Sequence, residues 1–236
     1  MNETTFDIAK MIDHTILKPE ATISDLEKAC RVAVIYGAAA LCVRPSDVKA
    51  AKVFLGGSGM KIATVVGFPH GNTDAPVKVF EAESAINNGA EEIDMVMNFG
   101  RFLSGESGYV ADEIKAVTKV VHDHGKTIKI IFETCYLSKE LIIEACKICN
   151  DALVDFVKTS TGFGTRGASF EDIITMREYC SPAVRIKASG GIKTLNDVLE
   201  MRRLGAARIG TSSTEVIMEE GVRIYGSNKT GSLSPL

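Results

Sequence analysis

Short apolar runs alternate with longer segments of helical periodicity along the chain. The runs begin near eight positions: Ile12, Ala39, Lys61, Glu91, Thr127, Val154, Val184 and Ala206. Their starts lie 22 to 36 residues apart, which is room for one strand, one helix and two short loops. Eight such units predict an α/β fold, a single (β/α)8 TIM barrel. An open doubly wound sheet is the alternative, but it usually has fewer strands, and the Gly-x-Gly-x-x-Gly turn usual after its first strand does not follow Ile12–Leu17.

Capping signals predict where several helices begin and end. Thr22 with Asp25 opens one that runs to Gly37, and Asp74 opens another, with Pro76 in its first turn, that closes at Asn88-Gly89. Ser138 and Thr194 are further N-cap candidates. No linker rich in Pro, Gly or Ser divides these units. We therefore predict one barrel domain over residues 1–225 and a flexible, small and polar C-terminal tail over residues 226–236.

Composition changes this picture little but excludes some partners. The formal net charge is −3 without a long run of one sign, so neither nucleic acid nor an anionic membrane is expected as a partner. No apolar run approaches the roughly 18 residues of a membrane span, and Met1 to Lys10 lacks the apolar core of an export signal. Six scattered cysteines indicate free thiols in a reducing compartment, and we expect a cytoplasmic protein. The Cys146/Cys149 pair is interpreted as buried helix residues.

Candidate chemistry lies near the predicted strand ends, where barrel enzymes carry their active sites. Side chains alternate along a strand, so the apolar neighbours of Lys187 and Asp94 place these two residues inside the barrel. Alternation along its own strand does not decide whether Lys158 points into the barrel or toward the helices. Comparison with the neighbouring strands favours the barrel interior. Asp13 is a further inward carboxylate. An Asp–Lys network with a purely structural role is the alternative.

A buried lysine is a chemical signal because burial favours its neutral amine, a nucleophile that forms Schiff bases with carbonyl carbon. A second ammonium disfavours protonation too, so Lys158 and Lys187 are each expected to lower the pKa of the other. Asp94 is then the acid/base candidate.

Glycine-rich segments follow the last three predicted strands. They are Gly162-Phe163-Gly164, Ser189-Gly190-Gly191 and Gly210-Thr211-Ser212-Ser213. Barrels often bind phosphate with these loops, through backbone N–H groups at a helix start. Arg166 is either a further cation for such a group or a solvated loop residue. The four histidines lack zinc-site spacing, so no metal and no cofactor is expected.

Several segments resemble the motifs of the deoxyribose-phosphate aldolase family. They are Ile12-Asp13-His14-Thr15, Gly67-Phe68-Pro69-His70-Gly71, Glu92-Ile93-Asp94-Met95-Val96, Phe156-Val157-Lys158-Thr159-Ser160-Thr161-Gly162, Ile186-Lys187-Ala188-Ser189-Gly190-Gly191-Ile192 and Arg208-Ile209-Gly210-Thr211-Ser212-Ser213. The resemblance runs in order from about Ile12 to Met218. It implies a cofactor-independent class I aldolase that reversibly cleaves 2-deoxy-D-ribose 5-phosphate to D-glyceraldehyde 3-phosphate and acetaldehyde. The sequence does not fix the oligomeric state, and a homodimer or a larger homo-oligomer is compatible with it.

The resemblance also implies roles for individual residues. Lys158 would form the Schiff base, Lys187 would depress its pKa, and Asp94 would be the acid/base partner. Asp13 would support the lysines, and the substrate-binding residues would be Thr15, Cys42 and Thr159. The phosphate would be held by Gly162, Gly190, Gly191, Gly210, Ser212 and Ser213.

The chain departs from this pattern in places. Some relatives have lysine in place of Phe163, many have glycine in place of Arg166, and His70 stands where the loop is often apolar. A terminal tyrosine reaches the site in some relatives, but eleven residues follow Tyr225 here. The alternatives are a Schiff-base lyase for another sugar phosphate, an isomerase with a carboxylate base such as Glu133, and a non-catalytic phosphosugar-binding barrel.

Overall fold

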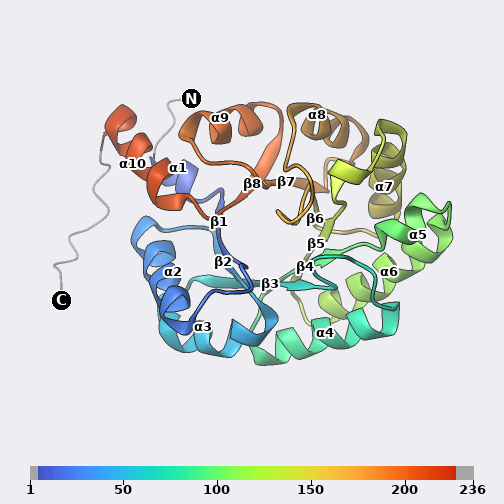
Figure 1. Cartoon of the computed structure of the whole chain (residues 1–236), viewed down its shortest axis with the longest axis horizontal. Coiled ribbons are helices and arrows are strands. Elements are labelled where there is room, and N and C mark those ends of the chain that lie inside the picture. Colours follow the sequence, from blue (N-terminus) through green and yellow to red (C-terminus); the bar gives the residue numbers. More distant parts are fainter. Residues whose placement is uncertain (1–4, 227–236) are drawn as a thin grey trace.

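Eight parallel strands close into a barrel in sequence order, in a computed structural model that describes residues 5–226 (Figure 1). The strands are β1 Ile12–Ile16, β2 Ala40–Val43, β3 Lys61–Val66, β4 Glu92–Val96, β5 Thr127–Ile131, β6 Phe156–Lys158, β7 Arg185–Ser189 and β8 Ala206–Thr211. Each begins within two residues of its predicted start. The predicted (β/α)8 barrel is confirmed.

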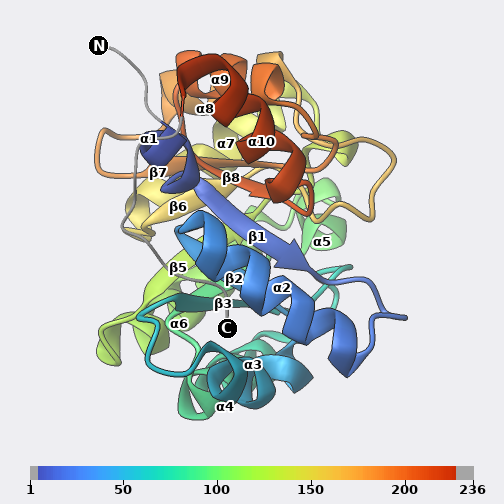
Figure 2. The same ribbon diagram turned by 90° about the vertical axis from the view of Figure 1, so that its left-hand side faces the viewer.

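Helices surround the barrel and connect successive strands (Figures 1 and 2). They are α1 Thr5–Ala9, α2 Ile23–Tyr36, α3 Val48–Leu55, α4 Ala75–Asn88, α5 Phe99–Leu103, α6 Ser107–Asp123, α7 Lys139–Asp151, α8 Phe170–Tyr179, α9 Leu195–Arg203 and α10 Thr214–Tyr225, with short 3-10 turns at Pro45–Asp47 and Thr134–Tyr136. The α1 and α5 helices, which the periodicity did not predict, lie outside the eight-unit repeat. α1 precedes β1 and packs against α10, as Figure 2 shows.

Three of the four predicted N-caps make a side-chain cap hydrogen bond, and Asp74 does not. Thr22 and Asp25 make a reciprocal capping box at the start of α2, which ends at Gly37 with φ of 67°. α4 follows Asp74, with Pro76 in its first turn, and ends at Gly89. Ser138 and Thr194 each accept a backbone N–H at the start of α7 and α9. Local sequence therefore helps to set these helix ends, because the side chains of Thr22, Ser138 and Thr194 satisfy backbone groups that a helix terminus leaves unpaired.

The barrel interior has two halves of different polarity. On one side a small apolar cluster is formed by Leu17, Ala40, Cys42, Ala63 and Val65, with Phe68 packed against it. The other side carries charged residues from β1 and β4 to β8. A much larger apolar core lies between the strands and the helices, and it contains the buried Cys146 and Cys149 of α7. Their interpretation as buried helix residues is confirmed.

The predicted tail, residues 226–236, lies outside the described residues except for Gly226. The division of the chain at residue 225 therefore stays a prediction. Between residues 5 and 226, no helix combines the length and apolar character needed to cross a membrane.

Candidate active site

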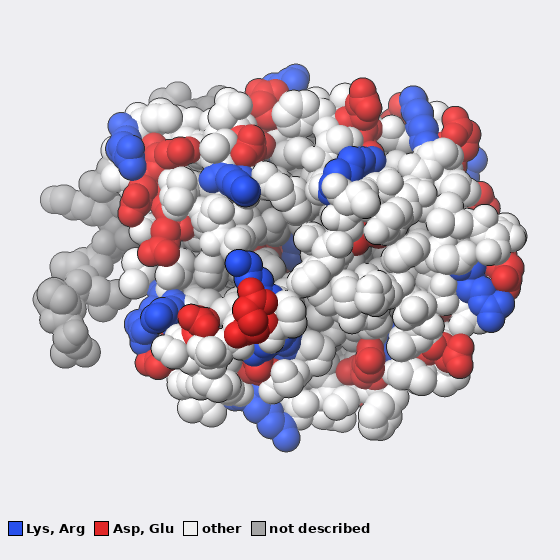
Figure 3. Space-filling model, viewed as in Figure 1, with Lys and Arg blue, Asp and Glu red and all other residues white. Residues whose placement is uncertain are grey.

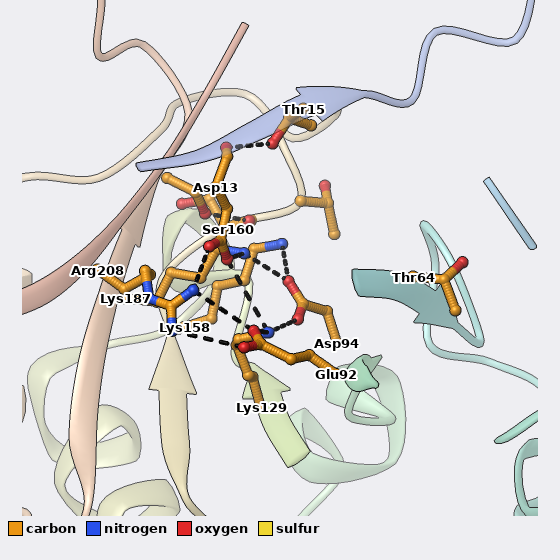
Figure 4. Close-up of polar contacts among 12 residues, drawn as sticks. Asp13, Thr15, Thr64, Glu92, Asp94, Lys129, Lys158, Ser160, Lys187 and Arg208 are labelled. Atoms are coloured by element: carbon orange, nitrogen blue, oxygen red, sulfur yellow. Dashed lines mark hydrogen bonds and ion pairs between the residues drawn. The ribbon is translucent and has the colours of Figure 1, made fainter. Parts of the chain in front are cut away.

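A cluster of buried charges fills the polar half of the barrel interior (Figure 4). Its cations are the buried Lys129, Lys158 and Lys187, from β5, β6 and β7, and the partly buried Arg208 of β8. Its carboxylates are Asp13 of β1 and Glu92 and Asp94 of β4. In this cluster four cationic side chains therefore face three carboxylates. Because unpaired buried charge is costly, one of the four is expected to be neutral.

Asp94 is the centre of the cluster. Its Oδ2 accepts from Nζ of Lys158 and of Lys187, each at 2.8 Å, and its Oδ1 accepts from Nζ of Lys129 at 2.7 Å. Burial alone would raise the pKa of Asp94, but the neighbouring lysines, Lys129 first, outweigh burial and hold it well below its usual range. Asp94 is thus a carboxylate at neutral pH.

Lys187 and Lys129 are firmly charged. Lys187 contacts both Asp13 and Asp94, while Lys129 also contacts Glu92 at 2.6 Å. Burial lowers their pKa values, yet the surrounding carboxylates more than offset it, so both pKa values are raised. The expectation that each lysine lowers the pKa of the other is therefore wrong for Lys187: its two aspartate partners prevail.

Lys158 is the exception among the three lysines. Burial lowers its pKa first, the charge of Lys187 lowers it further, and Asp94 only partly restores it. Its side chain is 3% exposed, with Asp94 as the carboxylate partner of its amine. Because the pKa values of Lys129 and Lys187 are raised and that of Lys158 is lowered, Lys158 is the one of these three amines that gives up its proton most readily.

A cavity of about 760 Å³ opens above Lys158 between the loops after β1, β6, β7 and β8. Figure 3 shows a hollow near the middle of this face. Of the residues predicted from sequence, the cavity is lined by Thr15, Lys158, Gly162, Gly190, Gly191, Gly210, Ser212 and Ser213. The structure thus brings the predicted phosphate loops and the predicted nucleophile together around one space.

The other predicted residues lie beneath or beside this cavity. Asp13 is fully buried and contacts Lys187 and Arg208. Cys42 belongs to the apolar half of the interior, and burial raises the pKa of its thiol to about 11. Thr159 does not line the cavity: its hydroxyl donates to the Ser189 carbonyl and accepts from the Ser189 N–H. The hydroxyl thus links β6 to β7, and a role of Thr159 in substrate binding stays a prediction.

Two further sequence candidates have structural partners. The Arg166 guanidinium pairs with Asp172, at 2.5 Å, so it is not a purely solvated residue, and a contact with phosphate stays a prediction. Glu133 accepts from the hydroxyl and N–H of Thr161. This contact holds the loop after β6 and takes Glu133 away from the role of a free catalytic base.

Sequence reasoning missed Lys129, Glu92 and Arg208. Lys129 stands between Ile128 and Ile130, the same alternation that placed Lys187 inside. Glu92 shares the parity of Asp94 on β4. The signal was therefore present for both, and it becomes clear only when alternation is applied to every strand rather than to the strand ends.

Metal-ligating side chains do not gather in this barrel. Over residues 5–226, no group of three or more His, Cys, Asp or Glu residues is arranged to hold a metal ion. His14, in β1, contacts the Thr214 hydroxyl through Nδ1 at 2.8 Å, and burial lowers its pKa to about 4. His14 is therefore neutral at pH 7, and it lines the cavity next to the start of α10.

Known proteins share this fold and sequence. The family model described as DeoC/LacD family aldolase matches residues 8–220. The deoxyribose-phosphate aldolase of Caldicellulosiruptor saccharolyticus is 50% identical over 218 residues, covering 92% of this chain and 99% of that protein. That of Thermococcus gammatolerans is 50% identical over 215 residues, covering 90% and 96%.

A solved structure agrees with these relatives. The tetrameric deoxyribose phosphate aldolase from Aeropyrum pernix superimposes with a TM-score of 0.86 at 30% identity, over 92% of this chain and 91% of that one. The family match spans all eight strands and every residue of the charged cluster. The chain belongs to the DeoC/LacD family of aldolases.

Proposed function

We propose that this chain is a class I aldolase that reversibly cleaves 2-deoxy-D-ribose 5-phosphate to D-glyceraldehyde 3-phosphate and acetaldehyde, with Lys158 as the Schiff-base residue. One observation carries the assignment of Lys158: of three buried lysines in contact with Asp94, it alone has a lowered pKa and lines the cavity. The named relatives support the substrate.

Cleavage begins when the neutral amine of Lys158 attacks C1 of the open-chain sugar. The carbinolamine hydroxyl takes up a proton from solvent, and water leaves to form the protonated imine. The C2–C3 bond then breaks, its electrons move into the imine, and the C3 hydroxyl loses its proton. Glyceraldehyde 3-phosphate leaves and an enamine of acetaldehyde remains. Protonation at the enamine carbon and hydrolysis release acetaldehyde and restore Lys158.

Asp94 and Lys187 serve this sequence in different ways. Asp94, held as a carboxylate, accepts the proton of the C3 hydroxyl through a water and returns it to the enamine carbon. Lys187 stays charged, and its field keeps the pKa of Lys158 low. Asp13 fixes Lys187 from the opposite side.

The phosphate is bound by the loops after β6, β7 and β8. Gly162, Gly190 and Gly191 have positive φ values of 89°, 83° and 78°. Their backbone thus adopts a conformation that would be strained in residues with a side chain. Ser212 and Ser213 line the cavity immediately before α10, where the helix start favours an anion. Holding the remote phosphate orients C1 toward Lys158.

The proposal is tested by incubating the protein with acetaldehyde and borohydride, followed by peptide mass spectrometry. We expect a reduced two-carbon adduct on Lys158, and release of triose phosphate from 2-deoxyribose 5-phosphate in a coupled assay. Lys158→Leu should lose both while keeping its fold. Labelling of Lys129 or Lys187 instead, or triose phosphate release without an adduct, would contradict the assignment.

We also infer that the protein acts in the cytoplasm as a homo-oligomer. Free cysteines, which include Cys146, Cys149 and Cys180, fit a reducing compartment. The tetrameric relative supports self-association. Light scattering at several protein concentrations measures the assembly, and a monomer throughout would contradict this part of the proposal.

A further inference from the structure

A second buried ion pair, outside the barrel interior, links the ends of two strands. Lys78 of α4 and Glu113 of α6 are 0% and 1% exposed, with Nζ at 2.7 Å from Oε1. The Lys78 amine also donates to the carbonyl oxygens of Gly71, at 2.7 Å, and Val96, at 2.9 Å. The second carboxylate oxygen of Glu113 accepts the N–H of Asn98 at 2.9 Å. All three protons of the ammonium group therefore have acceptors.

The backbone groups that this pair satisfies are those that β3 leaves without a partner. β3 ends at Val66, which pairs with Met95. Beyond that point Met97 still donates to Ile131 of β5, so the carbonyl of Val96 and the N–H of Asn98 face the side that β3 has left. Lys78 and Glu113 thus continue the hydrogen bonding of β4 past the end of its neighbour. Unpaired, these buried groups would be costly.

The same amine fixes the loop after β3, residues 67–71. Gly71 donates to Gly67 at 2.7 Å and closes the loop, while Lys78 holds the Gly71 carbonyl. A side chain at Gly67 would lie 2.7 Å from Cε of Lys78, so glycine there makes room for the lysine. Phe68, in this loop, makes an edge-to-face contact with Phe163, whose ring lines the cavity.

We propose that Lys78 and Glu113 are positioning residues for the aldol reaction, which hold the ends of β3 and β4 so that Asp94 stays on Lys158. Asp94 lies two residues before Val96 on the same strand. The pair contacts neither the cavity nor the loops after β6, β7 and β8. Its role is therefore in the reaction rather than in the binding of phosphate.

Lys78→Met tests this inference, which rests on the proposed function for its first readout. Because the phosphate loops are untouched, we expect kcat for 2-deoxyribose 5-phosphate to fall about tenfold while KM stays within about twofold. The second readout is the pH at which labelling of Lys158 by acetaldehyde and borohydride is half complete. Asp94 raises the pKa of Lys158, so a displaced Asp94 should move this midpoint to lower pH.

Two further variants separate positioning from stability. Ile114→Ala removes buried side-chain atoms next to Glu113 in α6 without removing a polar contact. Below its unfolding temperature, this variant should keep the wild-type labelling midpoint and kcat. Glu113→Gln retains an oxygen for Asn98 and should lose less activity than Lys78→Met. A folded Lys78→Met protein with wild-type kcat and midpoint would overturn the inference, as would equal losses in Ile114→Ala. If the wild type is labelled but does not cleave the sugar, the proposed function fails, and the labelling midpoint still decides the role of Lys78.

Discussion

Lys158 and Lys187 occupy the same register position on neighbouring strands, and both amines donate to the same oxygen, Oδ2 of Asp94. If both lysines were charged, their two ammonium groups would repel each other while sharing one acceptor oxygen. The outcome is unequal because Lys187 has a second carboxylate, Asp13, while Lys158 has only Asp94. Asp13 therefore decides which of the two lysines gives up its proton.

Lys187→Leu should raise the pH needed for imine formation. The charge of Lys187 lowers the pKa of Lys158, so removing it raises that pKa. A rise of about one unit leaves roughly tenfold less neutral amine at pH 7. The pH profile of Lys158 labelling measures it, with the exposed Lys147→Met as a control. An unchanged profile would contradict the electrostatic role of Lys187.

Lys129→Met should destabilise the fold strongly. It removes the amine that contacts Asp94 and Glu92, and breaking a buried ion pair typically costs about 3–5 kcal/mol. Lys61 also approaches Glu92, at 3.9 Å, but is 53% exposed, so Lys61→Met should cost at most about 1 kcal/mol. Urea unfolding compares the two. Similar losses for both variants would show that burial does not set the strength of these contacts.

Acid should weaken the protein through His14. Burial lowers the pKa of His14 from 6.5 to about 4 in the folded protein. As pH falls, the unfolded chain therefore binds this proton before the folded protein does. The contribution of neutral His14 to the free energy of unfolding is complete above pH 6.5 and is lost as pH falls toward 4. Between pH 7 and 5 this amounts to about 2 kcal/mol. Unfolding of wild type and His14→Gln at both pH values checks it. The same pH dependence in wild type and His14→Gln would contradict this role of His14.

Phe163→Lys should strengthen binding of the phosphate. Position 163 lines the cavity beside Gly162, and a cation there would meet the phosphate directly. We expect KM for 2-deoxyribose 5-phosphate to fall roughly threefold to tenfold at low salt and less at high salt. Phe163→Met controls for loss of the ring contact with Phe68. A KM that does not respond to the lysine would place the phosphate elsewhere.

Sequence alone was enough for the parts of the structure that depend on local patterns. Strand starts and helix caps follow from alternation and from residues such as Thr22 and Pro76, because these act on neighbouring backbone. The pairing of Lys158 and Lys187 around Asp94 was also within reach, since barrel closure brings strand interiors together.

Other parts of the site depend on contacts that sequence spacing does not encode. Lys78 and Glu113 are 35 residues apart on different helices, and no periodicity predicts that they meet. The raised pKa of Lys187 depends on Asp13, which lies 174 residues away, so counting nearby lysines gave the wrong direction. The hydroxyl of Thr159 has backbone partners on β7 that only the fold supplies.

The unequal number of charges in the barrel has an effect on the reaction itself. With Lys158 neutral, three cations balance three carboxylates, so the free enzyme is electrically matched at its centre. Turning Lys158 into an iminium adds one uncompensated positive charge, and electron flow from the breaking carbon–carbon bond removes it from the nitrogen. The proton that Asp94 takes from the C3 hydroxyl keeps the same charge in the interior, because three cations then face two carboxylates. The interior is electrically matched again only when hydrolysis restores the neutral amine of Lys158 and releases a proton.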